Sequence, residues 1–513
     1  EHHGKLETKS KVKLDSKEIL SLAYSPGVGA VSKVIGQDET LAREYTLKKN
    51  TIAVISDGSA ILGLGNLGAH AAIPVMEGKA AIFKEFAGVD AFPICVQTQD
   101  TEEIIKTVKY LAPVFGGINL EDISAPRCFE IEERLRKELS IPVMHDDQHG
   151  TAIISSAALL NALEIQKKKI DKVRFVINGA GAAAMACIRL YESLGAKPAN
   201  FMVFDKDGIL YKGRPVVEAL KHPFCVDAKY KEWTLAKAMK DADVFVGLSV
   251  GNVVTQEMVK SMAKNPIVFA MANPDPEITY DAAIASRKDL IMATGRSDYP
   301  NQVNNVLGFP YIFRGALDVR ATQINEAMKL AAVKALAELT KSPVPDIVNL
   351  AYNEKTIAFG PYYIIPKPVD PRLLATVAPA VAKAAMESGV ARTPIKDWDA
   401  YVIELNNRLG LDNQLSRVIG AKARKDPKRV VFADAENPKI LKAAALVLEE
   451  KVGYPILLGD INKINKIAAA NSIDLEGMPV INPKDDDMEE VRKQFGEAMF
   501  KKRQRKGINQ YEA

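Results

Sequence analysis

Residues 173–184 read Val-Arg-Phe-Val-Ile-Asn-Gly-Ala-Gly-Ala-Ala-Ala, and they are the clearest sign of the fold class. Its first five residues predict a buried strand, and a G-x-G-x-x-A turn follows, with a helix that stops at Gly195. A second strand, 201–204, ends in Asp205. Strand, glycine turn, helix, strand and terminal acid at this spacing indicate a dinucleotide-binding α/β fold with a doubly wound sheet.

The glycine turn predicts a nicotinamide dinucleotide, because glycines let the backbone approach a pyrophosphate at the helix N-terminus. Asp205 favours the free ribose 2′-hydroxyl of NAD, whereas Lys206 would meet the 2′-phosphate of NADP, so the choice stays open. Asn273, after the strand 267–271, is placed to contact the nicotinamide or the substrate, although a turn before Pro274 is the alternative. The predicted cofactor-binding residues are Gly179, Ala180, Gly181, Ala182, Ala183, Asp205, Lys206 and Asn273.

Two acidic clusters, 119–123 and 144–151, precede the glycine turn, and each follows a short apolar run that predicts a strand. Open α/β sheets place ligands at the carboxyl ends of their strands. Carboxylates that converge there would repel one another unless a cation held them, and oxygen ligands suit Mg²⁺ or Mn²⁺. The alternative is that the acids only cap helices and line solvated loops.

Lys79 and Tyr24 are the other candidates for chemistry. Lys79 is expected at the start of an apolar strand, where a lysine drawn toward carboxylates can act as a general base. The alternative is a surface lysine that keeps its ammonium group in water. Tyr24 is expected at the end of a helix over 13–24, beside a Pro-Gly turn, where a packing role is the alternative.

Two further patterns are not expected to bind what they superficially suggest. The earlier G-x-G-x-x-G at 63–68 lacks a dinucleotide context, because Pro74 interrupts the helix after it and no acid ends a second strand. Close backbone packing explains those glycines better. His145 and His149 are four residues apart, but His145 ends a strand, so the pair would not share a helical face for zinc.

The composition is that of a globular protein with three or so domains: 513 residues, 47% hydrophobic and 26% charged. A net charge of +4 is too balanced over this length to suggest nucleic acid. Four scattered cysteines fit a reducing cytoplasm. No stretch approaches the roughly 20 uninterrupted apolar residues of a membrane span, and no signal peptide is evident, so we expect a cytoplasmic protein without a membrane partner.

These motifs, in this order, resemble the malic enzymes over residues 10–395. From about residue 428 the chain resembles the opening of a phosphotransacetylase domain, as in the bacterial hybrid type, whose appended domain is generally regulatory and responds to acetyl-CoA. Here that domain looks truncated. The expected organisation is a substrate and metal domain (1–147), a Rossmann-type NAD(P)-binding domain (148–395), a linker (396–427) and a partial α/β phosphotransacetylase-like domain (428–513).

The resemblance implies metal-dependent oxidative decarboxylation of L-malate to pyruvate and CO₂, with NADP favoured over NAD, in a homo-oligomer. Lys79 would take the hydroxyl proton, the metal would act as a Lewis acid, and Tyr24 would protonate C3. An arginine that larger malic enzymes carry is replaced by Ala60, so Arg296, in the polar loop 294–305, is the candidate for the substrate carboxylate. The implied residues are Glu121, Asp122 and Asp147 (metal), Lys79, Tyr24 and Asp146 (catalysis), and Asn273, Asn305 and Arg296 (substrate).

Two other functions stay open from the residues alone. A metal-independent amino-acid dehydrogenase shares the two-domain plan, but it leaves the acidic clusters unexplained. An acyl-CoA-binding module or acetyl transferase with a vestigial dehydrogenase would place the function after residue 428.

Overall fold

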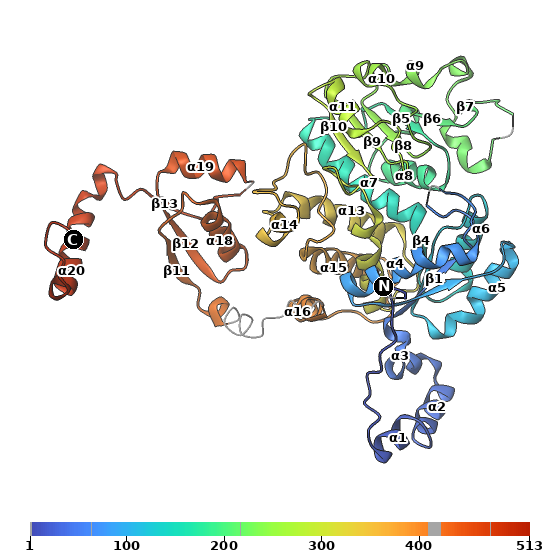
Figure 1. Cartoon of the computed structure of the whole chain (residues 1–513), viewed down its shortest axis with the longest axis horizontal. Helices are drawn as coiled ribbons and strands as arrows, with labels where there is room; N and C mark the ends of the chain where they lie inside the picture. The colour runs from blue at the N-terminus through green and yellow to red at the C-terminus, as the bar shows by residue number, and fades with distance from the viewer. Residues whose placement is uncertain (1–2, 63, 216, 409–421, 472) are drawn as a thin grey trace. The chain divides into compact units, whose positions relative to one another are not determined.

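The computed structural model describes residues 3–62, 64–215, 217–408, 422–471 and 473–513. The chain forms two compact units. The first comprises residues 1–340 and 360–411, and the second comprises residues 341–359 and 412–513. The first unit contains two sheets and the second contains one (Figure 1).

The first sheet has four parallel strands in the order β2-β1-β3-β4. Its central strand buries side chains on both faces, as a covered parallel sheet requires. Ile52 and Val54 pack into one core and Ala53 and Ile55 into another. The strands are β1 (Thr51–Ser56), β2 (Asp90–Cys95), β3 (Gly117–Leu120) and β4 (Val143–His145).

The second sheet has six strands in the order β10-β9-β8-β5-β6-β7, and only β7 runs antiparallel to its neighbour. The sequence order reverses at β5, so the sheet is doubly wound, as predicted. Its two faces carry separate cores, with Ile177 in one and Val176 in the other. The strands are β5 (Phe175–Asn178), β6 (Phe201–Asp205), β7 (Gly208–Ile209), β8 (Val244–Gly247), β9 (Ile267–Ala270) and β10 (Ile291–Thr294).

Helices cover both sheets of the first unit, with α7 and α8 on one face of the six-stranded sheet and α10 and α11 on the other (Figure 1). The helices are α1 (Lys17–Ala23), α2 (Val28–Gln37), α3 (Ala42–Tyr45), α4 (Ala69–Ala87), α5 (Thr101–Leu111), α6 (Arg127–Glu138), α7 (Asp146–Ile165), α8 (Ala182–Ser193), α9 (Leu235–Met239), α10 (Gln256–Lys260), α11 (Tyr280–Ser286), α12 (Phe309–Asp318), α13 (Glu326–Lys341), α15 (Arg372–Glu387) and α16 (Trp398–Arg408).

The second unit is a three-stranded parallel sheet, β11-β12-β13, with helices and a small core of its own. The β-α-β start expected after Pro427 is present. The elements are β11 (Lys428–Phe432), β12 (Gly453–Leu458), β13 (Val480–Ile481), α14 (Asp346–Ala351), α18 (Pro438–Glu449), α19 (Ile461–Ala470) and α20 (Glu489–Arg503).

One predicted element is wrong. Lys79 does not begin a strand, because it lies inside α4, and Pro74 lies within that helix rather than ending it. A short apolar run such as 80–83 does not separate a buried helix from a strand by its pattern alone. The buried positions Ala72, Met76, Ala80 and Phe83 follow the helical spacing.

The predicted domain boundaries stay predictions. The two sheets of the first unit lie on either side of residue 147, since β4 ends at His145 and β5 begins at Phe175. Residues 341–359, which we expected in the second domain, group with the C-terminal unit. Gly63 of the first glycine motif and residues 409–421 of the predicted linker lie outside the described residues.

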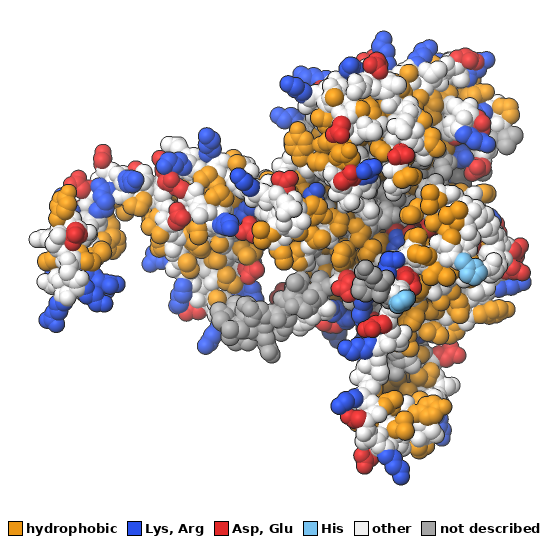
Figure 2. Space-filling model, viewed as in Figure 1, with side chains coloured by type: hydrophobic (Ala, Val, Ile, Leu, Met, Phe, Trp, Pro, Cys, Tyr) orange, Lys and Arg blue, Asp and Glu red, His pale blue; other side chains and the backbone are white. Residues whose placement is uncertain are grey.

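The helices α1 and α2 bury none of their residues. Together they cover Lys17–Gln37, a segment long and apolar enough for a membrane span by length and composition only. The structure breaks this segment between Ala23 and Val28 into helices of 7 and 10 residues, whereas a span needs about 20 in one helix. Figure 2 shows apolar side chains on the surface here, which include Leu20, Leu22, Val31 and Val34.

We expect Phe83→Ala to destabilise the first unit by about 3–5 kcal/mol, the usual range for a buried aromatic. Phe83 is fully buried, and its ring contacts Phe309 and Phe313 edge to face, with centroids 4.8 and 5.5 Å away. A lower thermal unfolding midpoint would show the loss. Tyr110→Ala, at a position that is 79% exposed in the same unit, should leave the midpoint almost unchanged.

Candidate active site

Lys79 lies between two buried carboxylates. Its Nζ donates to Asp146 Oδ2 at 2.7 Å and pairs with Glu121 Oε1 at 2.8 Å. The ammonium group also lies 4.2 Å from the centroid of the Phe309 ring. The side chain is 11% exposed, so Lys79 is not a surface lysine. The prediction that Lys79 and Asp146 form a pair is confirmed in this geometry, although from a helix rather than a strand.

Glu121, Asp122 and Asp147 form a cluster beside this pair. One oxygen from each lies within 4.8 Å of the other two. Glu121 and Asp122 follow β3, and Asp147 lies in the first turn of α7, directly after β4. The strand ends therefore converge as the sequence predicted. The Asp122 backbone N–H donates to Asp147 Oδ2 at 2.8 Å, which holds the two segments together.

Burial raises the pKa values of Glu121 and Asp122. The pKa of Glu121 lies well above its usual range because of burial. Burial and the nearby Asp147 raise the pKa of Asp122 to about 7. For Lys79, burial alone would lower the pKa, but Asp146 and Glu121 outweigh it and hold the pKa above its usual value. The lysine is therefore an ammonium group as long as both carboxylates face it.

The cluster fits a hard divalent cation. Its donors are all carboxylate oxygens, which Mg²⁺ and Mn²⁺ prefer over sulfur or nitrogen. Asp122 Oδ2 is buried and has no hydrogen-bond partner among the described residues. A buried carboxylate oxygen without a partner is costly unless a cation or a donor meets it. Glu121, Asp122 and Asp147 would hold the ion.

Several residues around Asp146 support its position. Asn305 Nδ2 donates to Asp146 Oδ2 at 3.2 Å, and Thr151 Oγ1 donates to Asn305 Oδ1 at 3.1 Å. Gly150 is required because a Cβ there would lie 2.1 Å from Asp146 Oδ1. Of these, Asn305 was a candidate from the sequence, whereas the supporting roles of Thr151 and Gly150 were not predicted.

Asn119 and Glu132 were also missed. Asn119 Nδ2 donates to Glu121 Oε2 at 2.9 Å and orients this carboxylate. Glu132 Oε1 accepts from the His145 backbone N–H at 3.2 Å and pairs with His149 Nε2 at 2.9 Å. The only sequence signal for Glu132 was its place on the buried face of α6. This pattern predicts burial, but it does not indicate that a buried acid supports the site. His145 ends β4, so the two histidines do not form a helical zinc pair.

The glycine turn has the predicted geometry. It joins β5 to α8, and Gly181 precedes the first helical residue, Ala182. Gly179 has φ of 117°, and a Cβ there would lie 2.4 Å from the carbonyl oxygen of Leu248. A Cβ on Gly181 would meet nothing within 4 Å, so open space faces the helix N-terminus. A pyrophosphate fits such a cradle.

Asp205 ends β6 as predicted, but it is not free. Arg214 Nη2 donates to Asp205 Oδ1 at 2.7 Å and to Oδ2 at 3.0 Å. The arginine side chain is only 10% exposed. Lys206 is exposed. Arg214 was not predicted from the sequence, because it lies nine residues away from Asp205 in an irregular segment.

Three predicted residues do not join Lys79 and the carboxylates. Tyr24 is 72% exposed at the end of α1. The guanidinium of Arg296 pairs with Asp298 at 2.7 Å instead. Asn273 is exposed after β9. Its amide nitrogen lies 3.8 Å from the position that a Cβ on Gly295 would occupy. Their predicted roles stay predictions.

Family models match most of the chain. The model for the malic enzyme N-terminal domain matches residues 3–136, and the model for the malic enzyme NAD-binding domain matches residues 148–350. The malic enzyme of Pyrococcus horikoshii is 43% identical, and its match covers 81% of this chain and 94% of that chain, with a TM-score of 0.69. The chain belongs to the malic enzyme family. A phosphate acetyl/butaryl transferase model matches residues 414–513, as the hybrid type requires.

Relatives of this family from Rhizobium meliloti differ in their cofactor. A NADP-dependent malic enzyme is 50% identical over 483 residues, which are 93% of this chain and 63% of that protein. A NAD-dependent malic enzyme is 48% identical over 458 residues, which are 89% of this chain and 59% of that protein. This chain therefore spans less than two thirds of the length of either relative.

Proposed function

We propose that this malic enzyme family member oxidises L-malate and decarboxylates the product to pyruvate and CO₂, with NADP as the hydride acceptor and Mg²⁺ or Mn²⁺ as the metal. One observation carries the proposal. Lys79 lies 2.7–2.8 Å from Asp146 and Glu121, beside three carboxylates that fit a divalent cation. An amino-acid dehydrogenase that uses no metal would have no use for this cluster.

In the proposed reaction, a divalent ion supplies Lewis-acid stabilisation of the negative charge that develops on oxygen. Glu121 pairs with Lys79 and would also hold the ion. With Glu121 on the ion, Asp146 would remain the partner of Lys79, and Asn305 holds Asp146 in place. Lys79 can then release a proton to Asp146 and accept the C2 hydroxyl proton of malate.

The proposed reaction has three steps, and its atoms and electrons balance. The hydride on C2 moves to the nicotinamide, and the hydroxyl proton moves to Lys79, which gives oxaloacetate. Cleavage of the C3–C4 bond releases CO₂ and leaves an enolate, and a proton donor then protonates C3 to give pyruvate. Phe309 against the ammonium group and the burial of Asp146 keep water away from the lysine side of the site.

We propose Tyr24 as the proton donor and Arg296 and Asn273 as substrate contacts, as the family resemblance implies. Tyr24 lies at the end of α1, and both α1 and α2 expose apolar side chains. We therefore also propose that a second copy of the chain covers these two helices. Light scattering after gel filtration measures the molar mass and so tests for a homo-oligomer. Leu22→Asp, at a position that is 73% exposed, should shift the equilibrium between oligomer and monomer toward the monomer.

We propose NADP because Arg214 neutralises Asp205. An unpaired carboxylate would repel a 2′-phosphate, whereas a guanidinium group binds one well. We expect Arg214→Gln to lower kcat/KM for NADP by roughly 10- to 100-fold, the equivalent of a charge-assisted hydrogen bond, and to affect NAD less. Lys206→Gln is the matched control. A larger loss of NADP use in Lys206→Gln than in Arg214→Gln would assign the phosphate to Lys206.

We propose that the C-terminal unit binds acetyl-CoA as an inhibitor. The match of residues 414–513 to the phosphate acetyl/butaryl transferase model supports this regulatory proposal. Inhibition of malate oxidation by acetyl-CoA, but not by CoA-free acetyl phosphate, tests it. We also propose a cytoplasmic location, which the free thiols of Cys95, Cys128, Cys187 and Cys225 support.

A further inference from the structure

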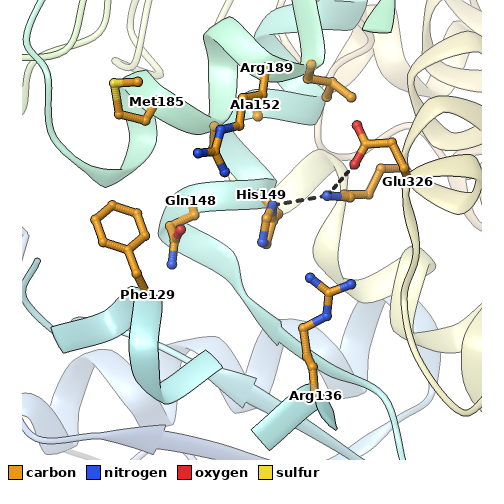
Figure 3. A pocket seen from close by; sticks show the side chains of 11 residues that line it. Phe129, Arg136, Gln148, His149, Ala152, Met185, Arg189 and Glu326 are labelled. Atoms are coloured by element: carbon orange, nitrogen blue, oxygen red, sulfur yellow. Dashed lines mark hydrogen bonds and ion pairs between the residues drawn. The ribbon is translucent and has the colours of Figure 1, made fainter. Parts of the chain in front are cut away.

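A polar cavity of about 210 Å³ lies in the first unit. Four helices line it, and they contribute Arg136 (α6), His149 (α7), Arg189 (α8) and Lys329 (α13). Figure 3 shows the two arginines pointing toward the cavity, with His149 between them. Neither Lys79 nor any of the carboxylates of the candidate metal cluster lines it. The cavity is smaller than the roughly 300–1,000 Å³ of clefts that hold drug-sized ligands, so its occupant is small.

The side chains that line this cavity carry a surplus of positive charge. Arg136, Arg189 and Lys329 supply three positive charges and Glu326 one negative charge, which leaves +2 when the pair of His149 with Glu132 is counted as neutral. Glu326 is already paired with Lys329 at 2.8 Å. The surplus therefore belongs to the two arginines.

Neither arginine side chain makes a hydrogen bond or an ion pair within the part of the chain that the structure describes; Arg189 is exposed, and Arg136 is half-buried. Arg136 Nε is buried and has no hydrogen-bond partner there. Leaving a buried charged donor unmatched costs more than an ordinary unmatched polar group. Guanidinium groups match the oxygens of carboxylates and phosphates, often with two parallel hydrogen bonds.

We propose that this cavity binds a small dianion, a phosphate or a dicarboxylate, between Arg136 and Arg189. The bound dianion would balance the charge of +2 and supply acceptors to both guanidinium groups. It would link α6, which packs on the first sheet, to α8, whose N-terminus follows the glycine turn. His149 lies in the first turn of α7 together with Asp146 and Asp147, so the site adjoins the catalytic helix without using its carboxylates.

Isothermal titration calorimetry of the full chain tests the proposal with two probes, inorganic phosphate and succinate, at constant ionic strength. We expect wild type to bind at least one probe, and the affinity to fall about 10- to 100-fold in Arg136→Gln and in Arg189→Gln, as for the loss of a charge-assisted hydrogen bond. The matched control is Lys137→Gln, which removes one charge from an exposed pair with Glu133 on the same helix. It should keep the wild-type affinity.

The two probes separate the sources of the anion, because a phosphate site prefers phosphate and a dicarboxylate site prefers succinate. If a glutamine variant does not fold, Arg189→Lys replaces it. This variant keeps the positive charge but cannot form two parallel hydrogen bonds, so it should bind the probe with intermediate affinity. No heat of binding for either probe in the wild type would overturn the proposal. Unchanged affinity in both glutamine variants would overturn the proposal as well. Succinate that binds in the catalytic site would give this result, because its affinity would not depend on Arg136 or Arg189.

Discussion

Replacing Lys79 by alanine is expected to lower kcat for malate-dependent NADP reduction by about 10²- to 10⁴-fold, the usual contribution of a positioned acid or base. Lys79 is the only described cation within ion-pair distance of Asp146 and Glu121. The variant keeps the three carboxylates, so it should still bind a divalent cation. Steady-state kinetics at saturating malate and Mn²⁺ measure the loss.

Lys79→Arg separates a proton acceptor from a mere counter-charge. Arginine keeps the positive charge between Asp146 and Glu121, but it does not lose its proton in proteins. We therefore expect Lys79→Arg to be nearly as inactive as Lys79→Ala. Near-native turnover of Lys79→Arg would mean that the charge alone matters. Lys84→Ala, five residues further along α4 in an exposed pair with Asp90, should keep wild-type activity.

Replacing Asp147 or Asp122 by asparagine is expected to raise the Mn²⁺ concentration needed for half-maximal activity by about 100-fold or more. Changes of residues that only support metal ligands typically cost 10- to 100-fold, and direct ligands should cost at least as much. Removal of the metal with EDTA should abolish activity, and added Mn²⁺ should restore it. Activity titrated with Mn²⁺ gives the apparent affinity of each variant.

The exposed carboxylate Asp15, which pairs with Lys13 near the N-terminus, offers the matched control. Asp15→Asn should require no more Mn²⁺ than wild type. If Asp147→Asn and Asp122→Asn also kept the wild-type Mn²⁺ requirement, the cluster would not be the metal site. Full activity of the wild type in EDTA would exclude a metal from the reaction.

The glycine turn and the acidic clusters were predictable from sequence because each depends on local order. A turn such as Gly179–Gly181 needs only a strand before it and a helix after it, and both are visible as apolar patterns. Parallel strands place their carboxyl ends together, so Glu121 and Asp147 could be placed on the same edge of a sheet before the structure was known.

The remaining features depend on contacts between distant segments. Lys79 was placed in a strand because four apolar residues in a row fit either element, and only packing of α4 against the first sheet decides for a helix. Arg214 reaches Asp205 from an irregular segment without a repeating pattern. Arg296 looked free in the sequence, but its nearest acid, Asp298, takes its guanidinium group.

The most direct test of the central proposal is the product balance of the purified chain with L-malate, NADP and Mn²⁺. NADPH, pyruvate and CO₂ are measured together in the same reaction. The proposal predicts that the three products form in equal amounts. Without the metal, none of the three should form. NADPH formation with accumulating oxaloacetate and no CO₂, or no reduction of either NADP or NAD, would contradict it.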